Sequence, residues 1–544
     1  MTETDSARSG RKEVHHSIRP IFYSLLLFAL TGCGGGASTS GIEASGVNKT
    51  PLVATMSAAT MATDAAVSIG FSADVDPVTV NPSSIRVTGP EGAVTGSVGY
   101  DSATKTATFT PAAPLMPRTS YTVSLTAAIK DAAGGTVGEK TWRVATGTDL
   151  LARDAGDVVP ATLFGKHMHR ALAGTAWPSV KFGTWRLWDA FVTWPDLEPA
   201  KGAWNFSKLD AYVDMAEQRG VELLLPLSQS PRWASARPDE PSAYGAGKAA
   251  EPANLDDWKN YVSTVATRYK GRIHYYELWN EINAKNFYTG TTDQMILLAK
   301  SAYETIKAID PSATVISPSF CPPENHTEMF DDYLAKGGAN YADAFTYHFY
   351  VKPGTPEQMI SFVNAVKAVM ARHGVTKPLW NTESGWYIES SAKPAGAAGA
   401  DRYLTYHEAA AYIARSYVLQ WAMGVDRFYL YAWDNYNSGL VQNDGTTLKP
   451  SASAYNQIAT WLEGASVKSC GKNSAGTWVA AIARENGSKG WIVWTTEGEK
   501  SFNVPAEWGV DKVSDLYGNT SSLNGNNAAI GIAPVLFSKN QGMP

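Results

Sequence analysis

The sequence contains little cysteine and no excess of positive charge. Among its 544 residues are three cysteines, Cys33, Cys321 and Cys470, which are too few and too scattered for a disulfide framework or a zinc site. The sequence leaves open whether Cys321 and Cys470 pair. The 46 basic and 51 acidic residues give a net charge of −5, which does not indicate binding to nucleic acid or to another polyanion. A neutral ligand fits this charge better.

Apolar runs long enough to cross a membrane are also missing near the N-terminus. Residues 21–30 form an apolar run about half as long as a bilayer requires, and basic residues precede it. This pattern predicts an export signal. The run ends in Leu30-Thr31-Gly32-Cys33, which resembles the lipobox of bacterial lipoproteins, whose cysteine is lipidated and becomes the mature N-terminus. Because glycine rather than aspartate follows Cys33, the resemblance favours the outer membrane. An ordinary signal peptide cut near the same place is the alternative.

Composition divides the rest of the chain into segments. Residues 1–33 are the predicted lipoprotein signal, and residues 34–50 are small and polar, as in a flexible tether. Residues 51–148 alternate in short runs separated by turn residues, which predicts a small antiparallel β-sandwich. The stretches 109–123 and 130–134 resemble bacterial immunoglobulin-like modules. Short runs without a helical period return in residues 465–544, where we expect a second small β-sandwich.

Strand and helix patterns alternate between residues 155 and 464. The helical patterns cover residues 210–219, 255–269, 293–309, 356–373, 407–423 and 453–462. The apolar runs cover residues 161–169, 183–189, 221–227, 273–279, 313–319, 344–350, 378–382 and 427–433. Eight strand-helix units predict a (β/α)₈ TIM barrel, and a doubly wound open sheet is the weaker alternative.

Two glutamates stand where apolar runs of this barrel give way to loops. Glu281 follows the fourth run and Glu383 the seventh, so both are expected at the C-terminal face of the barrel, where such folds hold their active sites. Glu277 has the same strand parity as Glu281 but lies roughly 13 Å deeper at about 3.3 Å per residue. We therefore expect Glu277 to line the barrel as the partner of a basic residue, and the other two to be the reactive pair.

The motifs around these glutamates resemble those of the retaining clan A glycoside hydrolases. Residues 278–281 (LWNE) are similar to the acid/base motif, and residues 381–386 (NTESGW) are similar to the nucleophile motif. The resemblance covers about residues 160–540 and is greatest to family 39, in particular to endoglycosidases encoded with bacterial exopolysaccharide operons. It implies that Glu281 is the acid/base and Glu383 the nucleophile, with Arg186 supporting the nucleophile. Ile282 departs from the proline of many relatives, which should affect loop shape more than chemistry.

A retaining mechanism assigns a physical role to each neighbour. The two carboxyl groups should lie about 5 to 5.5 Å apart. Arg186 near Glu383 is expected to keep that carboxylate charged, with a low pKa, while burial against Trp279 and the charge of Glu383 keep Glu281 protonated. Asn280 can bond the sugar 2-hydroxyl. Either Tyr350 or His348 is expected to hydrogen-bond the nucleophile. The alternative for Arg186 is a barrel arginine paired with Asp189.

Aromatic residues are plentiful, at 11% of the chain, and several stand at or after strand ends, where rings can stack on sugars. These are Trp188, Trp194, Trp233, Tyr288, Trp386, Tyr387 and Trp433. His167 and His169 could suggest a metal site, but no third ligand stands at a helpful spacing, so we expect substrate-contacting or core histidines. The loop 230–254, rich in proline, alanine and glycine, is a candidate wall or lid of the cleft.

Together these features predict a retaining β-glycosidase that cleaves a bacterial exopolysaccharide, with endo action favoured. The expected site consists of Glu281 and Glu383 with the supporting residues Arg186, Asn280, His348, Tyr350, Trp433, His169, Trp233 and Trp386. We expect a monomer that needs neither a metal nor another cofactor. We also expect it to be attached to the outer membrane through Cys33. Two alternatives are an exo-acting β-xylosidase-like enzyme and a non-catalytic polysaccharide-binding or adhesion lipoprotein. The sugar and its linkage cannot be read from the sequence.

Overall fold

The computed structural model describes most of the chain after residue 51. The described ranges are 52–56, 60–61, 66–89, 92–112, 115, 120–131, 134–146, 156–322, 327–396, 402–473 and 475–539. The predicted signal, the lipidation site Cys33 and the tether lie outside these ranges. Within them, no helix combines the length and the apolar character needed to cross a membrane.

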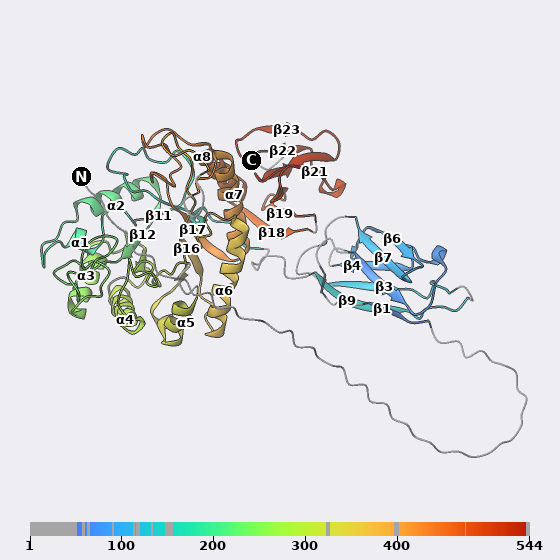
Figure 1. Ribbon diagram of the computed structural model, residues 1–544, viewed down its shortest axis with the longest axis horizontal. Helices are drawn as coiled ribbons and strands as arrows, with labels where there is room; N and C mark the ends of the chain where they lie inside the picture. Colours follow the sequence, from blue (N-terminus) through green and yellow to red (C-terminus); the bar gives the residue numbers. More distant parts are fainter. Residues whose placement is uncertain are drawn as a thin grey trace, which may run out of the picture. The chain divides into compact units, whose positions relative to one another are not determined.

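The N-terminal domain is a β-sandwich (Figure 1), and its sheets have the orders β1-β3-β7-β6 and β2-β9-β8-β4-β5. Its strands pair antiparallel except β2 and β9, which pair in parallel. Burial alternates along strands such as β8, so each contributes one face to a core around Ile69, Phe109 and Val123. The expected immunoglobulin-like sandwich is confirmed. Its elements are β1 (Ala54–Met56), β2 (Thr60–Met61), β3 (Val67–Phe71), η1 (Pro77–Thr79), β4 (Ile85–Gly89), β5 (Gly92–Ala93), β6 (Gly96–Asp101), β7 (Thr106–Pro111), β8 (Ser120–Leu125) and β9 (Lys140–Thr146).

The central domain is a (β/α)₈ barrel, as the eight apolar runs predicted. Its parallel strands follow the order β14-β13-β12-β11-β10-β17-β16-β15, and a parallel bridge between Ile316 and Ala344 closes the ring between β14 and β15. The strands are β10 (Phe164–His167), β11 (Thr184–Arg186), β12 (Glu222–Leu227), β13 (Tyr275–Leu278), β14 (Thr314–Ile316), β15 (Phe345–Thr346), β16 (Leu379–Ser384) and β17 (Val425–Leu430). They are the first to eighth barrel strands, and each overlaps its predicted run.

Helices surround the barrel, and side-chain caps set where several begin (Figure 1). Thr291 and Gln294 form a capping box at α4, and Thr405 and Glu408 form another at α7. The helical elements are η2 (Ala161–Leu163), α1 (Trp194–Leu197), α2 (Ser207–Arg219), α3 (Leu255–Arg268), α4 (Thr292–Ile309), α5 (Glu328–Ala335), η3 (Gly338–Tyr341), η4 (Pro356–Gln358), α6 (Met359–Arg372), α7 (Tyr406–Ala422) and α8 (Pro450–Leu462). The short helices α1 and α5 had no counterpart among the predicted helical patterns.

The C-terminal domain is also built from antiparallel sheets, one with the order β18-β19-β20-β25-β22-β23 and one made of β21 and β24. Trp494 donates from its indole nitrogen to Glu357 of η4 at 3.0 Å, so the domain shares polar contacts with the barrel helices. The elements are β18 (Ala465–Lys472), β19 (Thr477–Arg484), β20 (Lys489–Thr495), β21 (Lys500–Asn503), η6 (Ala506–Trp508), β22 (Lys512–Ser514), β23 (Thr520–Ser522), β24 (Asn527–Ile530) and β25 (Val535–Ser538).

Candidate active site

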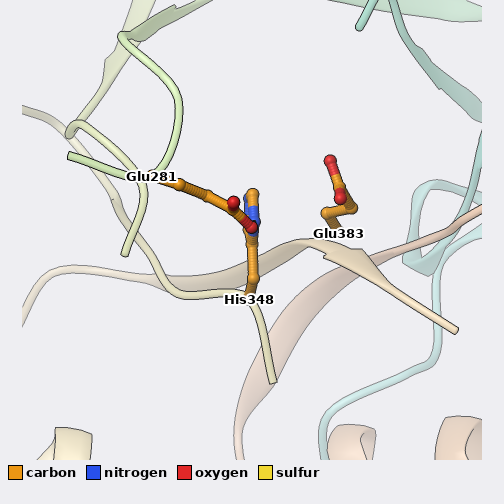
Figure 2. Close-up of side chains that lie close together, drawn as sticks. All are labelled: Glu281, His348 and Glu383. Atoms are coloured by element: carbon orange, nitrogen blue, oxygen red, sulfur yellow. The ribbon is translucent and has the colours of Figure 1, made fainter. Parts of the chain in front are cut away.

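The two glutamates singled out in the sequence face one another at the C-terminal end of the barrel. Glu281 lies three residues beyond β13, and Glu383 is the next-to-last residue of β16. Figure 2 shows their side chains converging from opposite sides, with His348 beside Glu281. One carboxylate oxygen of each glutamate and one ring nitrogen of His348 all lie within 4.8 Å of one another. Each glutamate residue is only 8% exposed, so both carboxyl groups lie in a largely desolvated place.

The backbone that carries Glu281 is bent in an unusual way. Trp279 and Glu281 have φ angles of 69° and 45°, in the left-handed region that residues with a side chain seldom adopt. Such conformations cost about 1–3 kcal/mol each and persist where the surroundings determine them. Here the amide of Glu281 donates to Ser319 Oγ at 2.9 Å, and the amide of Ile282 donates to the Ser319 carbonyl at 3.0 Å. A proline at position 282 could not make the second bond.

Arg186, on β11, joins the buried charges beneath the site. Its Nε and Nη2 each donate to a different oxygen of Glu277 at 2.7 Å, and its Nη1 donates to Glu383 Oε2 at 2.8 Å. Nη2 also donates to Asn280 Oδ1 at 2.7 Å. Arg186 and Glu277 are fully buried. Glu277 therefore lies where the sequence placed it, as the partner of a basic residue, and the guanidinium orients both the nucleophile candidate and Asn280.

The alternative pairing of Arg186 with Asp189 does not occur. The carboxylate of Asp189 instead accepts hydrogen bonds from Tyr244 at 2.5 Å and from Tyr431 at 2.6 Å. Burial alone would lower the pKa of Arg186, but the negative charges of Glu277 and Glu383 outweigh it and raise that pKa overall. Arg186 is thus a permanent cation under the site.

His348 and Tyr350 follow β15 and contact different glutamates. His348 Nδ1 lies 2.7 Å from Glu281 Oε1, and its Nε2 lies 3.1 Å from the Thr382 hydroxyl. Tyr350 donates its phenolic hydrogen to Glu383 Oε1 at 2.9 Å. Of the two candidates for a hydrogen bond to the nucleophile, the structure therefore places Tyr350 there and His348 on the acid/base candidate.

Burial dominates the pKa values at this site. It raises the pKa of Glu281 to about 7 and lowers that of His348 to about 4, so His348 is neutral and Glu281 keeps a proton up to neutral pH. Burial also raises the pKa of Glu383, and the positive charge of Arg186 opposes this rise. We expected Arg186 to make this pKa low; the difference arises because Arg186 is shared with Glu277 while Glu383 is desolvated.

Two neighbours of Glu281 differ from the expectation. The ring of Trp279 packs against Trp258 and Tyr288, with ring centroids 6.0 and 5.3 Å away, on the helix side of the strand. The side chain of Cys321, after β14, hydrogen-bonds the Glu281 carboxyl and partly offsets the rise in its pKa that burial causes. The sequence offered no motif for this role. Neither Cys321 nor Cys470 forms a disulfide among the described residues.

A cavity of about 450 Å³ opens beside the glutamates, formed by loops after β10, β11, β12 and β17. This volume is typical of ligand pockets. Trp188 connects the cavity to the site, because its ring lies 5.6 Å from the Arg186 guanidinium. The lining residues are His169, Arg170, Trp188, Asp189, Phe191, Thr193, Asp196, Gln229, Tyr244, Lys248, Tyr431, Asp434, Asn435 and Tyr436. His169 and the loop 230–254, which supplies Tyr244 and Lys248, are thus at the cavity as expected.

Of the seven predicted stacking rings, Trp188 lines the cavity and the other six do not. Trp386, Trp433 and Trp233 are held by contacts within the protein. Trp386 and Trp433 are 3% and 2% exposed, and their indole nitrogens donate to the Gly354 and Ala176 carbonyls. Trp233 is half-buried and donates to the Glu198 carbonyl at 2.9 Å. None of the three lines the cavity. The rings that do so without having been singled out are Phe191, Tyr244, Tyr431 and Tyr436. Phe191 and Asp189 both have a positive φ. No sequence motif indicates this backbone conformation.

Among the residues that the structure describes, the two histidines expected on the first strand belong to no cluster of possible metal ligands. His167 Nε2 lies 3.0 Å from the Thr382 carbonyl, and the ring of His169 faces Tyr431 with centroids 5.1 Å apart. Glu281, His348 and Glu383 are close enough to hold a cation. However, Arg186 already supplies the positive charge at Glu383, 2.8 Å away. This donor set is therefore better suited to proton transfer than to metal binding.

A closed barrel with buried glutamates at the ends of its fourth and seventh strands is the arrangement expected of a glycoside hydrolase. Comparison with known protein families identifies the particular glycoside hydrolase family. Residues 142–387 match the family model described as Glycosyl hydrolases family 39, and residues 47–146 match that of the Bacterial Ig-like domain. The chain therefore carries a family 39 glycoside hydrolase domain preceded by a bacterial immunoglobulin-like domain, and the resemblance to family 39 noted in its motifs is confirmed.

Solved structures agree on the fold. The chain is similar to a family 39 glycoside hydrolase from Bacteroides cellulosilyticus WH2, with 16% identity, a TM-score of 0.55, and coverage of 89% of this chain and 99% of that one. It is also similar to a glucosidase from Croceicoccus marinus, with 14% identity, a TM-score of 0.51, and coverage of 72% and 98%. At these identities the likeness establishes the fold alone.

Curated proteins match over a shorter stretch. The chain is 29% identical over 94 residues to Endo-1,4-beta-xylanase A from Caldicellulosiruptor sp. (strain Rt8B.4), which covers 16% of this chain and 14% of the xylanase. The chain thus spans only about a seventh of the length of that relative.

Proposed function

We propose that the protein is a retaining β-glycosidase in which Glu383 is the nucleophile and Glu281 the acid/base. The observation that carries this proposal is the spacing of the two carboxyl groups, whose nearest oxygens lie within 4.8 Å. Retaining enzymes have carboxyl groups about 5–5.5 Å apart, whereas inverting enzymes separate them by about 6.5–9.5 Å to admit a water. A spacing this short lies below the range of inverting pairs and supports direct attack by Glu383 on the sugar.

The contacts of each glutamate divide the roles between them. Arg186 and Tyr350 donate one hydrogen bond to each oxygen of Glu383, which favours its ionised, nucleophilic form. Glu281 has a pKa raised to about 7 by burial and faces neutral His348, so it retains the proton that the leaving group needs.

The reaction then proceeds in two displacements. A Glu383 oxygen bonds to the anomeric carbon while the bond from that carbon to the leaving oxygen breaks, and the Glu281 proton passes to that oxygen. Glu281, now a carboxylate, takes a proton from a water molecule. The resulting hydroxide oxygen bonds to the anomeric carbon and releases Glu383. Asn280, held by Arg186, is positioned to bond the sugar 2-hydroxyl through its amide group.

The substrate we propose is a β-linked bacterial exopolysaccharide cleaved internally. Phe191, Tyr244 and Tyr436 are 64%, 36% and 59% exposed and line the cavity beside the glutamates. Exposed rings around a cavity beside the catalytic pair suit contacts with further sugars of a chain, whereas an exo-acting enzyme needs a site for one terminal sugar. The curated relative named above is an endoxylanase, which keeps a xylan-like main chain as a second candidate substrate.

We further propose that the enzyme is exported and anchored to the bacterial outer membrane through a lipid on Cys33. This rests on the sequence of residues 11–35, which lies outside the described structure. Metabolic labelling with a fatty acid tests the anchor: wild-type protein should carry the label and Cys33→Ala should not. Label on the alanine variant would contradict it.

Proton NMR of the product released from a polysaccharide or an aryl β-glycoside tests the mechanism, because retention gives the β-anomer first. Glu383→Gln and Glu281→Gln should each lower kcat by at least about 10³-fold. Azide, a small external nucleophile, should restore turnover of an aryl glycoside in Glu281→Ala, with a β-glycosyl azide as product. Initial release of the α-anomer would overturn the retaining assignment. Unchanged turnover in Glu383→Gln would overturn the assignment of the nucleophile.

A further inference from the structure

The cavity beside the glutamates has an unbalanced set of charges. It is lined by three acidic residues, two basic residues and a histidine. The acidic side chains are all occupied by protein donors. Asp189 accepts from two tyrosine hydroxyls, Asp196 from the amide and hydroxyl of Thr193, and Asp434 from the amides of His169 and Arg170. Their oxygens are therefore engaged within the protein.

The cationic side chains of the same cavity have fewer partners within the protein than the acidic ones. Over the part of the chain that the structure describes, the ammonium of Lys248 has no hydrogen-bond or ion-pair partner. Arg170 donates from Nη2 to the Asp434 carbonyl at 3.0 Å, but its Nε makes no hydrogen bond and lies 3.9 Å from Asp434 Oδ2. Donor capacity thus exceeds acceptor capacity in the cavity.

A buried, unpartnered histidine nitrogen adds to this imbalance. Nε2 of His169 is buried and has no hydrogen-bond partner in the described structure. Buried polar atoms are almost always satisfied, so an exception in a ligand-sized cavity indicates a group that the ligand supplies. The His169 ring packs beside Tyr431, whose hydroxyl is fixed by Asp189, so the imidazole is held in place.

We propose that this cavity binds an acidic sugar, the carboxylate of a uronic acid residue in the polysaccharide, through Lys248 with Arg170 and His169 around it. The inference rests on the proposed glycosidase function and narrows its substrate class. Carboxylates form strong charge-assisted hydrogen bonds with lysine and arginine. Phe191 and Tyr436 provide apolar faces for the sugar ring itself.

The position of the cavity fits a sugar next to the one that is cleaved. Neither Glu281 nor Glu383 is among its lining residues, yet Trp188 and Tyr431 adjoin both the cavity and the catalytic groups. A net charge of −5 for the chain suggested a neutral ligand, but net charge does not describe a single cavity. The acidic residue of the polysaccharide would bind away from the reacting carbon, where its charge does not oppose attack by Glu383.

Binding to the Glu383→Gln variant tests the proposal without turnover. Calorimetry would compare three β-1,4-linked trisaccharides of uronic acids, built from glucuronate, galacturonate and mannuronate, with their carboxyl-reduced neutral counterparts. We expect at least one acidic trisaccharide to bind about tenfold or more tightly than its neutral counterpart, with the difference shrinking as salt rises. A panel in which no acidic sugar binds better than its neutral counterpart overturns the proposal.

Two further variants identify the residue responsible. Lys248→Met in the Glu383→Gln background should reduce the acidic-to-neutral affinity ratio about tenfold or more, because the ammonium that faces the carboxylate is gone. Lys259→Met removes the same charge from the exposed face of α3 and should leave the ratio unchanged. An acidic preference that survives Lys248→Met would overturn the assignment. Hydrolysis of neutral aryl glycosides by the wild type tests the glycosidase function separately, so the two can fail independently.

Discussion

His348 and Tyr350 lie two residues apart on one segment and hydrogen-bond opposite members of the carboxyl pair. His348 contacts Glu281 at 2.7 Å, and Tyr350 contacts Glu383 at 2.9 Å. The segment after the sixth barrel strand therefore places one group on the acid/base and one on the nucleophile. Because the carboxyl groups are only a few ångströms apart, two residues of one segment can each hydrogen-bond a different glutamate.

The hydroxyl of Tyr350 should contribute directly to the rate. Tyr350→Phe removes a hydrogen bond to a charged group, which is worth about 1.5–3 kcal/mol, so kcat should fall roughly 10- to 100-fold with little change in KM. The acid limb of the pH profile should move to higher pH, since the lost donor favoured ionised Glu383. Steady-state kinetics across pH would measure both effects.

Tyr261→Phe provides the control for that variant. Tyr261 is fully buried on α3, and its hydroxyl has no hydrogen-bond partner in the described structure. It should therefore keep the wild-type kcat and pH profile. Equal losses in both variants would mean that a general packing defect, and not contact with the nucleophile, explains the loss at Tyr350.

The pH profile should end on the alkaline side near pH 7. The pKa of Glu281 is raised to about 7 by burial, and the acid must be protonated for the first step, so kcat/KM should fall as the pH rises through this value.

The thiol of Cys321 partly offsets this rise in the pKa of Glu281 by hydrogen bonding. Cys321→Ala should therefore move the alkaline limb to higher pH, and Cys321→Ser, which keeps a donor, should restore it. A limb that stays fixed in the alanine variant would contradict this contact.

Most of the fold and the central pair of residues were predictable from the sequence because they depend on patterns. Eight apolar runs placed Glu281 and Glu383 on the same face, and strand parity placed Glu277 beneath them. Parity could not separate His348 from Tyr350, because residues two apart point the same way. Lys248 and Cys321 were beyond prediction, since each reaches the site from a loop whose path is set by tertiary contacts.

Aromatic residues show a second limit of sequence reasoning. Tryptophans at strand ends were expected to stack on sugars, yet Trp386 and Trp433 are buried and their indole nitrogens are satisfied by carbonyls. The exposed rings come from positions such as Phe191, where the backbone has a φ of 57°. A left-handed conformation is uncommon at a residue with a side chain, and nothing in the local sequence signals it here.

Lys166 on β10 should lower the stability of the barrel. It is fully buried, with its ammonium group near the ring of Tyr455 and no hydrogen-bond partner in the described structure, and burial places its pKa well below the usual value. A lysine whose folded pKa is depressed destabilises the fold at every pH below its unfolded pKa of about 10.4, and the cost vanishes as the pH rises to that value.

Lys166→Met should therefore raise the free energy of unfolding at pH 7 by roughly 1–3 kcal/mol, with a smaller gain near pH 10. Urea unfolding at the two pH values would measure the difference. Lys259→Met, at an exposed position on α3, should change stability by less than about 0.5 kcal/mol. A loss of stability in Lys166→Met at pH 7 would show that the contact with Tyr455 outweighs the desolvation of the ammonium group.

Tyr244 connects the long loop after β12 to the body of the site. Its hydroxyl donates to Asp189 at 2.5 Å, while Asp189 also fixes Tyr431, so one carboxylate holds two rings of the cavity. Tyr244→Phe keeps the ring but releases the loop from Asp189. Since the cavity lies beside the reacting groups, KM for an oligosaccharide that fills it should rise about 3- to 10-fold, while kcat for a short aryl glycoside should stay within about twofold.

Tyr517→Phe, which alters another exposed tyrosine in the C-terminal domain, should change neither constant. If KM for the oligosaccharide stayed at the wild-type value in Tyr244→Phe, other contacts would hold the loop. The hydrogen bond from Tyr244 to Asp189 would then not contribute to binding.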